Sequence, residues 1–203
     1  MEGIMAWYSF LAIPLGYLIG SFPSTLIIGR LMGKQDMRTE GDGKISAAAV
    51  YRRMGRIPYA IVVLMDIGKG ALAIVAARAL TDSVALVLIA GFFAYVGHSW
   101  SIFMKFQGGL GATVMCGVLG ATVFWPLVIG LVVGVIYLLI TRRSGVGSVV
   151  VIGVITIALL VQRFILHQEQ EQPWYIVLYP LILGSLMMLK HLQTRKLAPK
   201  SRG

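Results

Sequence analysis

The sequence has few charged residues and almost no cysteine. Charged residues make up 13% of the 203 positions, against about 25% in soluble domains. The single cysteine, Cys116, lies in an apolar run, which excludes a disulfide framework, a multi-cysteine metal site and a redox pair. By contrast, 58% of the residues are hydrophobic and the mean hydropathy is +0.84. This composition excludes a soluble globular enzyme, a disordered chain and a secreted disulfide scaffold, and it predicts an all-α polytopic membrane protein.

Long apolar runs alternate with short polar segments along the chain. The apolar runs cover residues 5–32, 57–80, 83–104, 112–125, 126–140, 146–166 and 173–190. At about 20 residues per spanning helix, the length leaves no room for a separate soluble domain, so we expect one integral membrane domain over residues 1–203. The first run follows Glu2 rather than a basic segment, and no cleavable signal peptide is expected.

The region 112–140 decides the number of spans. One helix over this region would be about 43 Å long, too long for a hydrocarbon core of about 30 Å unless it tilts strongly. A break at Trp125-Pro126 would give two short helices instead. Seven spans, with the N-terminus outside and the C-terminus in the cytoplasm, place fifteen of the eighteen basic residues on the cytoplasmic side, as the positive-inside rule favours. We therefore predict about seven transmembrane helices, two of them short.

The net charge of +10 would suggest nucleic-acid binding in a soluble protein. In a membrane protein it is more typical of basic cytoplasmic loops that face anionic lipid. We therefore expect membrane lipids, and no nucleic acid, as partners. The polar, glycine-containing loops all fall on the cytoplasmic side of this topology, so any chemistry is expected at the inner membrane surface.

The polar loop Arg38–Gly55 combines glycines with basic residues. Gly41 and Gly43 permit a close approach of the backbone to a ligand, and a short helix is predicted over Ser46–Met54, with its first residue as the N-cap. Amide groups at such a helix start bind anions, and Arg52 adds positive charge. The alternative is a solvated basic loop that holds two spans near the lipid headgroups.

The second polar loop, Gly97–Thr113, ends in a glycine cluster. Gly108, Gly109 and Gly111 come just before an apolar helix, where backbone amides would again bind phosphate. This cluster is not a P-loop, because no Lys-Ser or Lys-Thr follows the glycines. His98 is either a titrating group or a hydrogen-bonded histidine at the interface, and the glycines alternatively serve close helix packing.

Ionisable residues within apolar helices are candidates for function. Asp66 and Lys69 are three residues apart in the second run and share a helix face. They are either functional or a structural pair that neutralises itself, and they are the only support for a small transporter. Arg142, in the third loop, and His191, near the C-terminus, are further basic groups at the cytoplasmic side or simple headgroup anchors.

Several kinds of chemistry are excluded. None of the three histidines has an aspartate five residues later, so no His-x₄-Asp acyltransferase dyad exists. The sequence has no G-x-S-x-G nucleophile elbow and no pair of histidines at zinc-ligand spacing. Cys116 lies in an apolar helix without a nearby base, which argues against covalent catalysis. We expect no metal and no organic cofactor.

The order of these motifs resembles the bacterial acyl-phosphate-dependent glycerol-3-phosphate acyltransferases, the PlsY family. The resemblance runs from about Leu15 to Arg195. The segments that carry it are Leu15–Ser24, Arg38–Gly55, Asp66–Gly70, Gly97-His98, Phe106–Thr113 and Lys190-His191. It implies a seven-span fold in the bacterial cytoplasmic membrane.

The resemblance also implies a reaction. A fatty acyl group would pass from acyl phosphate to sn-glycerol 3-phosphate and give lysophosphatidic acid, without a protein nucleophile. The implied catalytic residues are Arg52 and His98. Phosphate binding would fall to Gly41, Gly43, Lys44, Lys69, Gly108, Gly109, Gly111, Arg142 and His191.

The sequence departs from the family pattern at several polar positions. Gln107 and Leu110 stand where two lysines are expected, and Asp42 stands in place of a serine, where it would repel phosphate. Near the C-terminus, Gln193 and Thr194 replace a glutamate and an asparagine. Two hypotheses follow: an active acyltransferase, or an inactive family member that serves as an accessory subunit or lipid-binding scaffold of a membrane complex.

Overall fold

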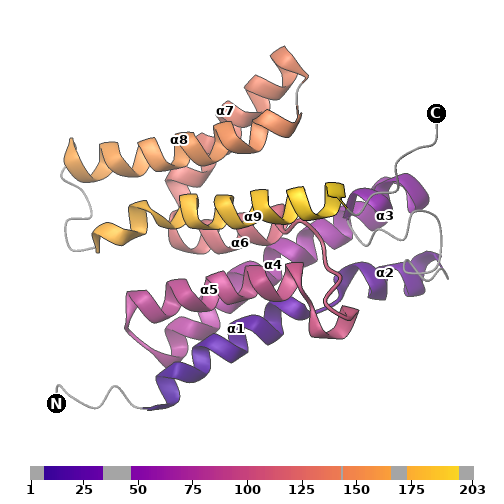
Figure 1. Cartoon of the computed structure of the whole chain (residues 1–203), viewed down its shortest axis with the longest axis horizontal. Coiled ribbons are helices and arrows are strands. Elements are labelled where there is room, and N and C mark those ends of the chain that lie inside the picture. Colours follow the sequence, from indigo (N-terminus) through magenta and orange to yellow (C-terminus); the bar gives the residue numbers. More distant parts are fainter. Residues whose placement is uncertain (1–6, 34–46, 143, 166–172, 197–203) are drawn as a thin grey trace. The chain divides into compact units, whose positions relative to one another are not determined.

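The computed structural model describes residues 7–33, 47–142, 144–165 and 173–196, which are helical with short connections (Figure 1). This confirms the all-α prediction over the described residues. The chain divides into two compact units, Met1–Thr122 (unit 1) and Val123–Gly203 (unit 2). Each unit has its own helix packing.

Unit 1 is built around two long helices, α4 and α5. Its elements are η1 (Trp7–Leu11), α1 (Ala12–Ser21), α2 (Ser24–Gly33), α3 (Ala47–Met54), α4 (Arg56–Leu80), α5 (Val84–Ser99), η2 (Ile102–Met104) and α6 (Ala112–Thr122). Helix α4 contacts α1, α2, α3, α5 and α6, so it forms the centre of the unit. The short helix predicted in the first polar loop is confirmed as α3, and its predicted N-cap lies outside the described residues.

Helices α1 and α5 pack closely along small residues. A Cβ atom at Gly16 would overlap the backbone of Ala90, and one at Gly20 would overlap that of Ala94. Small residues at such contacts let two membrane helices approach backbone to backbone. At the end of the same contact, Gly97 lies against the carbonyl oxygen of Tyr17. The C-terminal end of α5 is therefore held against the end of α1.

Helices α4 and α6 are in close contact in the same way. A Cβ atom at Gly70 would overlap the carbonyl oxygen of Val114, and one at Gly117 would overlap that of Ile67. Because the two overlaps run in opposite directions, neither helix can carry a larger residue there without moving apart. This contact brings the start of α6 beside the middle of α4.

Unit 2 consists mainly of three apolar α-helices of 18, 21 and 18 residues. Its elements are α7 (Phe124–Thr141), α8 (Ser144–Phe164), η3 (Trp174–Val177) and α9 (Tyr179–Lys196). Helix α8 packs against α7 and α9. Gly130 and Gly134 of α7 lie against Ile155 and Val151 of α8, and Gly184 of α9 lies against Ile152. Glycines again set the helix spacing.

The seven apolar helices predicted from the sequence are present, but one of them is short rather than two. Within the part of the chain that the structure describes, six helical segments are long and apolar enough to cross a membrane, and α6 is a shorter apolar helix. The break falls at Val123, before the predicted Trp125-Pro126 position. Pro126 therefore lies in the first turn of α7, where its missing N–H costs no intrahelical hydrogen bond. This gives α7 its 18 residues, about 27 Å of helix.

The first apolar run is interrupted, which its hydropathy did not predict. Helix α1 ends at Ser21 and α2 begins at Ser24. Proline at position 23 cannot donate a hydrogen bond within a helix and pushes the preceding residue to an extended conformation, and Phe22 has φ −52° and ψ 123°. The interruption leaves backbone carbonyls without helical partners inside an apolar unit.

Candidate active site

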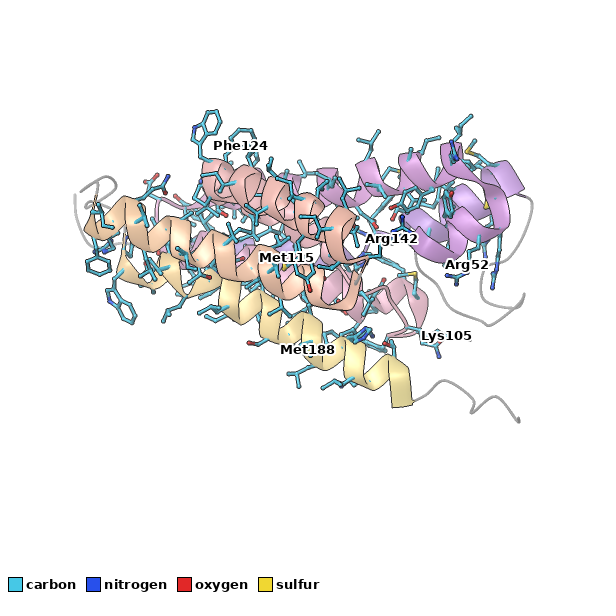
Figure 2. All side chains as sticks on the ribbon, turned by 90° about the horizontal axis from the view of Figure 1, so that it is seen from above. Arg52, Lys105, Met115, Phe124, Arg142 and Met188 are labelled. Atoms are coloured by element: carbon cyan, nitrogen blue, oxygen red, sulfur yellow. The ribbon has the colours of Figure 1, made fainter. Side chains whose placement is uncertain are left out.

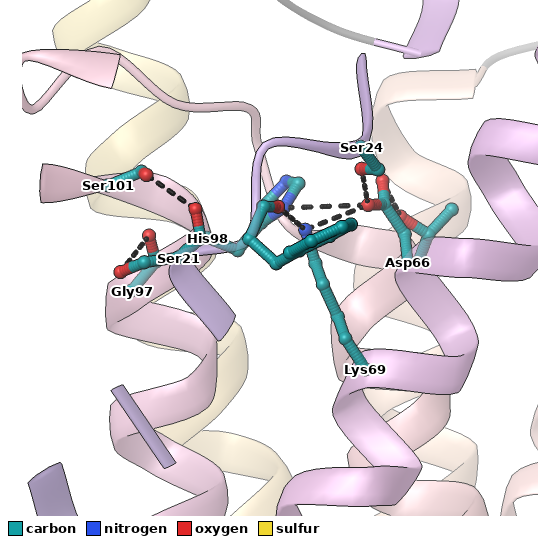
Figure 3. A network of polar contacts seen from close by, with 9 residues as sticks. Ser21, Ser24, Asp66, Lys69, Gly97, His98 and Ser101 are labelled. Atoms are coloured by element: carbon teal, nitrogen blue, oxygen red, sulfur yellow. Dashed lines mark hydrogen bonds and ion pairs between the residues drawn. The ribbon is translucent and has the colours of Figure 1, made fainter. Parts of the chain in front are cut away.

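A buried carboxylate lies at the centre of unit 1. The Asp66 side chain, on α4, is 2% exposed and accepts hydrogen bonds from hydroxyls of two other helices (Figure 3). Ser24 Oγ, at the start of α2, donates to Asp66 Oδ1 at 2.5 Å. Thr113 Oγ1, in the first turn of α6, donates to Asp66 Oδ2 at 3.1 Å. A single carboxylate thus connects α2, α4 and α6.

Lys69 supplies the opposite charge. Its Nζ lies 2.9 Å from Asp66 Oδ1, so the two residues form the ion pair that their spacing indicated. Both side chains are buried, and a buried charge without a partner would cost several kcal/mol. Lys69 Nζ also donates to the carbonyl oxygen of Phe22 at 3.1 Å. A phosphate-binding role for Lys69 stays a prediction.

The interruption between α1 and α2 is stabilised by side chains from neighbouring elements. Ser101 Oγ donates to the carbonyl oxygen of Ser21 at 2.6 Å, and Lys69 donates to that of Phe22. In the other direction, Ser21 Oγ donates to the carbonyl oxygen of Gly97 at 3.3 Å. Irregular backbone at membrane depth is tolerated only where protein groups satisfy it. These hydrogen bonds fix the interruption to α4, α5 and the loop after α5.

His98 lies in the last turn of α5 and is 6% exposed. Its Nδ1 is 3.9 Å from Asp66 Oδ1, beyond hydrogen-bond distance but close enough for the carboxylate to attract an imidazolium. Its other ring nitrogen faces the glycine cluster, because a Cβ atom at Gly109 would lie 2.7 Å from His98 Nε2. The structure therefore brings His98, Asp66 and the glycine cluster together.

The glycine cluster lies directly on the end of α5. The N–H of Gly108 donates to the carbonyl oxygen of Ser99 at 3.2 Å, and a Cβ atom there would overlap the carbonyl oxygen of His98. Gly111 has a φ of +79° and lies against the ring of Tyr95. These contacts explain the glycines as sites of close approach, and their binding of phosphate stays a prediction.

Arg52 lies on the exposed side of α3. The buried side of α3 contributes Ala49 and Val50 to a hydrophobic cluster that also contains Met104 of η2. This shared cluster keeps α3 beside the loop that follows α5. Figure 2 shows Arg52 at the same end of unit 1 as Lys105, which directly follows η2.

The remaining predicted residues fall elsewhere. Gly41, Gly43 and Lys44 lie outside the described residues. Arg142 directly follows α7 and has a φ of 55°, and His191 lies in α9, so both belong to unit 2. Their participation in one site with Arg52 and His98 stays a prediction.

Sequence reasoning missed two members of the buried network, Ser24 and Thr113. Ser24 directly follows Pro23. A hydroxyl residue beside a proline in an apolar run is the sequence signal that could have identified it. Thr113 follows the glycine cluster and opens the apolar run of α6. Ser24 donates to Asp66 and not to His98, so these residues do not form a Ser-His-Asp relay. The arrangement is suited to positioning and charge stabilisation.

Together, the fold and the network define an all-helical integral membrane protein with a buried polar centre. A family model described as "Glycerol-3-phosphate acyltransferase" matches residues 10–198, and the chain belongs to this family. Glycerol-3-phosphate acyltransferase 2 of Moorella thermoacetica is 37% identical over 180 residues, covering 87% of this chain and 86% of that protein. The glycerol-3-phosphate acyltransferase of Bartonella henselae is 34% identical over 194 residues, covering 91% and 84%. The resemblance drawn from the motifs is thereby confirmed.

The fold also matches a solved structure. The crystal structure of PlsY (YgiH), an integral membrane glycerol 3-phosphate acyltransferase in its glycerol 3-phosphate form, superposes with a TM-score of 0.77. The match covers 93% of this chain and 90% of that one, at 22% sequence identity. A second structure of that protein, in its lysophosphatidic acid form, gives a TM-score of 0.72. At this identity the likeness concerns the fold.

Proposed function

We propose that this protein transfers a fatty acyl group from an acyl phosphate to sn-glycerol 3-phosphate and so forms lysophosphatidic acid. The observation that carries the proposal is the family match over residues 10–198, which includes the segments that build the Asp66 network. The solved PlsY structures in glycerol 3-phosphate and lysophosphatidic acid forms support the same acceptor and product. No observation favours the inactive alternative.

The reaction requires no protein nucleophile. The oxygen of a glycerol hydroxyl attacks the acyl carbonyl carbon and forms the new ester bond. The bond from that carbon to the phosphate oxygen breaks, and inorganic phosphate leaves with the electron pair. The hydroxyl proton passes to a base or to the departing phosphate. Alignment of two bound substrates and stabilisation of negative charge supply the rate enhancement.

We assign the roles as follows. Arg52 stabilises negative charge in the transition state, and His98 is the candidate base. Phosphate binding falls to Gly41, Gly43, Lys44, Gly108, Gly109, Gly111, Arg142 and His191, with Lys69 either a further phosphate ligand or the counter-charge of Asp66. Positive charge and backbone amides are the groups that bind phosphate in proteins.

The positive-inside rule places the N-terminus outside and the C-terminus in the cytoplasm. The proposed site then opens to the cytoplasmic face of a bacterial inner membrane, as one integral membrane domain. The matched relatives of Moorella and Bartonella are bacterial proteins, which supports this location. A cytoplasmic site suits a water-soluble acceptor and a lipid-soluble donor.

The direct test uses purified protein in lipid with palmitoyl phosphate and glycerol 3-phosphate. We expect lysophosphatidic acid and inorganic phosphate in equal amounts. Arg52→Ala is expected to abolish the product, whereas Arg78→Ala, which removes an exposed charge in the last turn of the same unit's α4, is expected to leave it unchanged. Product formation at the wild-type rate by Arg52→Ala would overturn the assignment of Arg52. Wild-type protein that makes no product but co-purifies with a stable partner would favour the scaffold hypothesis.

A further inference from the structure

The turn Ser101–Gln107 presents a single cation at the end of a membrane span. Lys105 is the only ionisable side chain between Ser99 and Thr113, and it is exposed. It directly follows the candidate span Val84–Met104. A lysine at the end of a span lies where hydrocarbon gives way to lipid headgroups and water. Within the described residues, its ammonium group has no hydrogen-bond or ion-pair partner.

The same turn exposes an apolar rim of three large side chains close to Lys105 in the sequence. Ile102, Phe103 and Phe106 are 52%, 53% and 59% exposed. The fourth apolar residue of the turn, Met104, is instead 4% exposed and packs into the cluster shared with α3. Exposed apolar side chains of a membrane protein face lipid, so a charge beside them at the end of a span gives a surface of mixed character that suits a ligand or lipid with both characters.

The backbone holds Lys105 in a defined position. Lys105 and Phe106 have φ values of 51° and 61°, two consecutive left-handed residues without a glycine. Such backbone persists only where surrounding contacts enforce it, and it is often found at ligand sites. Here Phe106 N–H donates to the carbonyl oxygen of Ser101 at 2.8 Å, and Gln107 N–H donates to that of Met104 at 3.0 Å. These hydrogen bonds hold the turn in place, and a site that is held before binding loses less conformational freedom when a ligand binds.

The turn is also attached to the candidate active site. Ser101 Oγ donates to the carbonyl oxygen of Ser21 at the interrupted first span. Met104 lies in one hydrophobic cluster with Val50 of α3, the helix that carries Arg52. Figure 2 shows Arg52 and Lys105 toward the same end of the unit. Arg52 and Lys105 are both cations, whereas the pair of Asp66 with Lys69 is neutral overall.

We propose that this turn is the docking site for the acyl phosphate donor. Lys105 contacts the donor's phosphate group, and Ile102, Phe103 and Phe106 contact the first carbons of its acyl chain as it leaves the bilayer. An acyl phosphate has an anionic head on an apolar chain, which matches a cation beside an apolar rim. This inference rests on the proposed function and names which of its two substrates the turn receives.

The test is a pair of substitutions at Lys105, one that removes the charge and one that keeps it. Asparagine tolerates the left-handed region, so Lys105→Asn removes the charge and preserves the turn. In Lys105→Asn we expect the KM for palmitoyl phosphate to rise at least tenfold and the KM for glycerol 3-phosphate to stay within twofold. Lys105→Arg keeps the charge and is expected to keep the wild-type KM for palmitoyl phosphate. Arg78→Gln serves as the control for the loss of one exposed charge. An unchanged KM for palmitoyl phosphate, or a rise only in the KM for glycerol 3-phosphate, would overturn the proposal.

The apolar rim is tested with acyl phosphates of different chain length. Phe103→Ser is expected to raise the KM for palmitoyl phosphate several-fold more than the KM for butyryl phosphate, because the short chain reaches less of the rim. Equal effects on both donors would remove the rim from the proposal. These comparisons separate docking of the donor from a general effect on folding, which would alter both substrates alike.

Two further experiments are needed. The first distinguishes docking of the donor from binding of membrane lipid, and the second distinguishes a failure of this proposal from a failure of the proposed function. In neutral phosphatidylcholine nanodiscs, the effect of Lys105→Asn on KM is expected to persist. If it appears only with anionic phosphatidylglycerol present, Lys105 is a headgroup anchor and the proposal is wrong. If wild-type protein makes no lysophosphatidic acid, the proposed function fails, and direct binding of palmitoyl phosphate to wild type and Lys105→Asn still decides the docking site. Equal binding by both would overturn it.

Discussion

Hydroxyl side chains serve different purposes in the two units. In unit 1, Ser24, Ser101 and Thr113 donate to groups on other elements, two of them to Asp66. In unit 2, Thr141 and Thr156 donate to carbonyl oxygens one turn back in their own helices. A hydrogen bond of this kind stays within one helix and does not connect two elements. In unit 1, Ser24 and Thr113 hold a charged centre, although Thr122 of the same unit also bonds one turn back in its own helix.

This difference explains where function is expected. Unit 2 sets its helix spacing by glycines that lie against aliphatic side chains, as Gly184 does against Ile152. Unit 1 uses the same glycine contacts but adds a buried ion pair and an interrupted helix, which are costly inside a membrane protein. Costly groups persist where they position something, and in unit 1 they lie beside His98 and the glycine cluster.

The largest effect is expected from breaking the buried ion pair. Asp66→Asn leaves the Lys69 charge buried without its partner, and Lys69→Gln does the same to the Asp66 carboxylate. Removal of one member of a buried pair typically costs about 3–5 kcal/mol, so each single variant should lose at least a hundredfold in acyl transfer. The double variant Asp66→Asn/Lys69→Gln removes both charges, keeps hydrogen-bonding capacity and is expected to recover at least tenfold over Lys69→Gln alone.

The double variant also separates the two roles of Lys69. If Lys69 is mainly the counter-charge of Asp66, the double variant keeps the wild-type KM for glycerol 3-phosphate. If Lys69 is a phosphate ligand, the double variant is no better than Lys69→Gln, and both show a raised KM. Melting temperature in detergent, measured beside kcat and KM, shows how much of each loss comes from folding.

The sequence predicted the helices and part of the site for identifiable physical reasons. Hydropathy alone located each apolar run, because burial in lipid requires about 20 apolar residues regardless of packing. It did not predict the interruption after Ser21, because Phe22 and Pro23 are themselves compatible with an apolar run. Partners of Asp66 such as Ser24 are distant in sequence and meet it only through helix packing. Among the partners of Asp66, only Lys69 could be predicted from sequence spacing, because it lies on the same helix.

A second substitution disturbs the contact between α4 and α6 that places Thr113 beside Asp66. A Cβ atom at Gly70 would overlap the carbonyl oxygen of Val114, which is backbone and cannot rotate away. Overpacking of this kind typically costs about 1–3 kcal/mol, so Gly70→Ala should lower kcat and the melting temperature together. Gly68→Ala is the matched control two residues away, because a Cβ atom there meets nothing within 4 Å. Equal behaviour of the two variants would show that the contact between α4 and α6 does not position the site.

The smallest and most direct comparison exchanges one hydroxyl in each unit. Ser24→Ala removes a hydrogen bond to a buried carboxylate, a bond worth about 1.5–3 kcal/mol, so activity is expected to fall roughly tenfold. Thr156→Val removes a hydroxyl that bonds only one turn back, at 2.9 Å to the carbonyl oxygen of Ile152. Hydrogen bonds in membrane proteins average about 0.6 kcal/mol, so this variant should melt within a few degrees of wild type and keep its activity. A loss of activity in Thr156→Val as large as in Ser24→Ala would mean that the contrast between the units reflects general destabilisation and not a positioned charge.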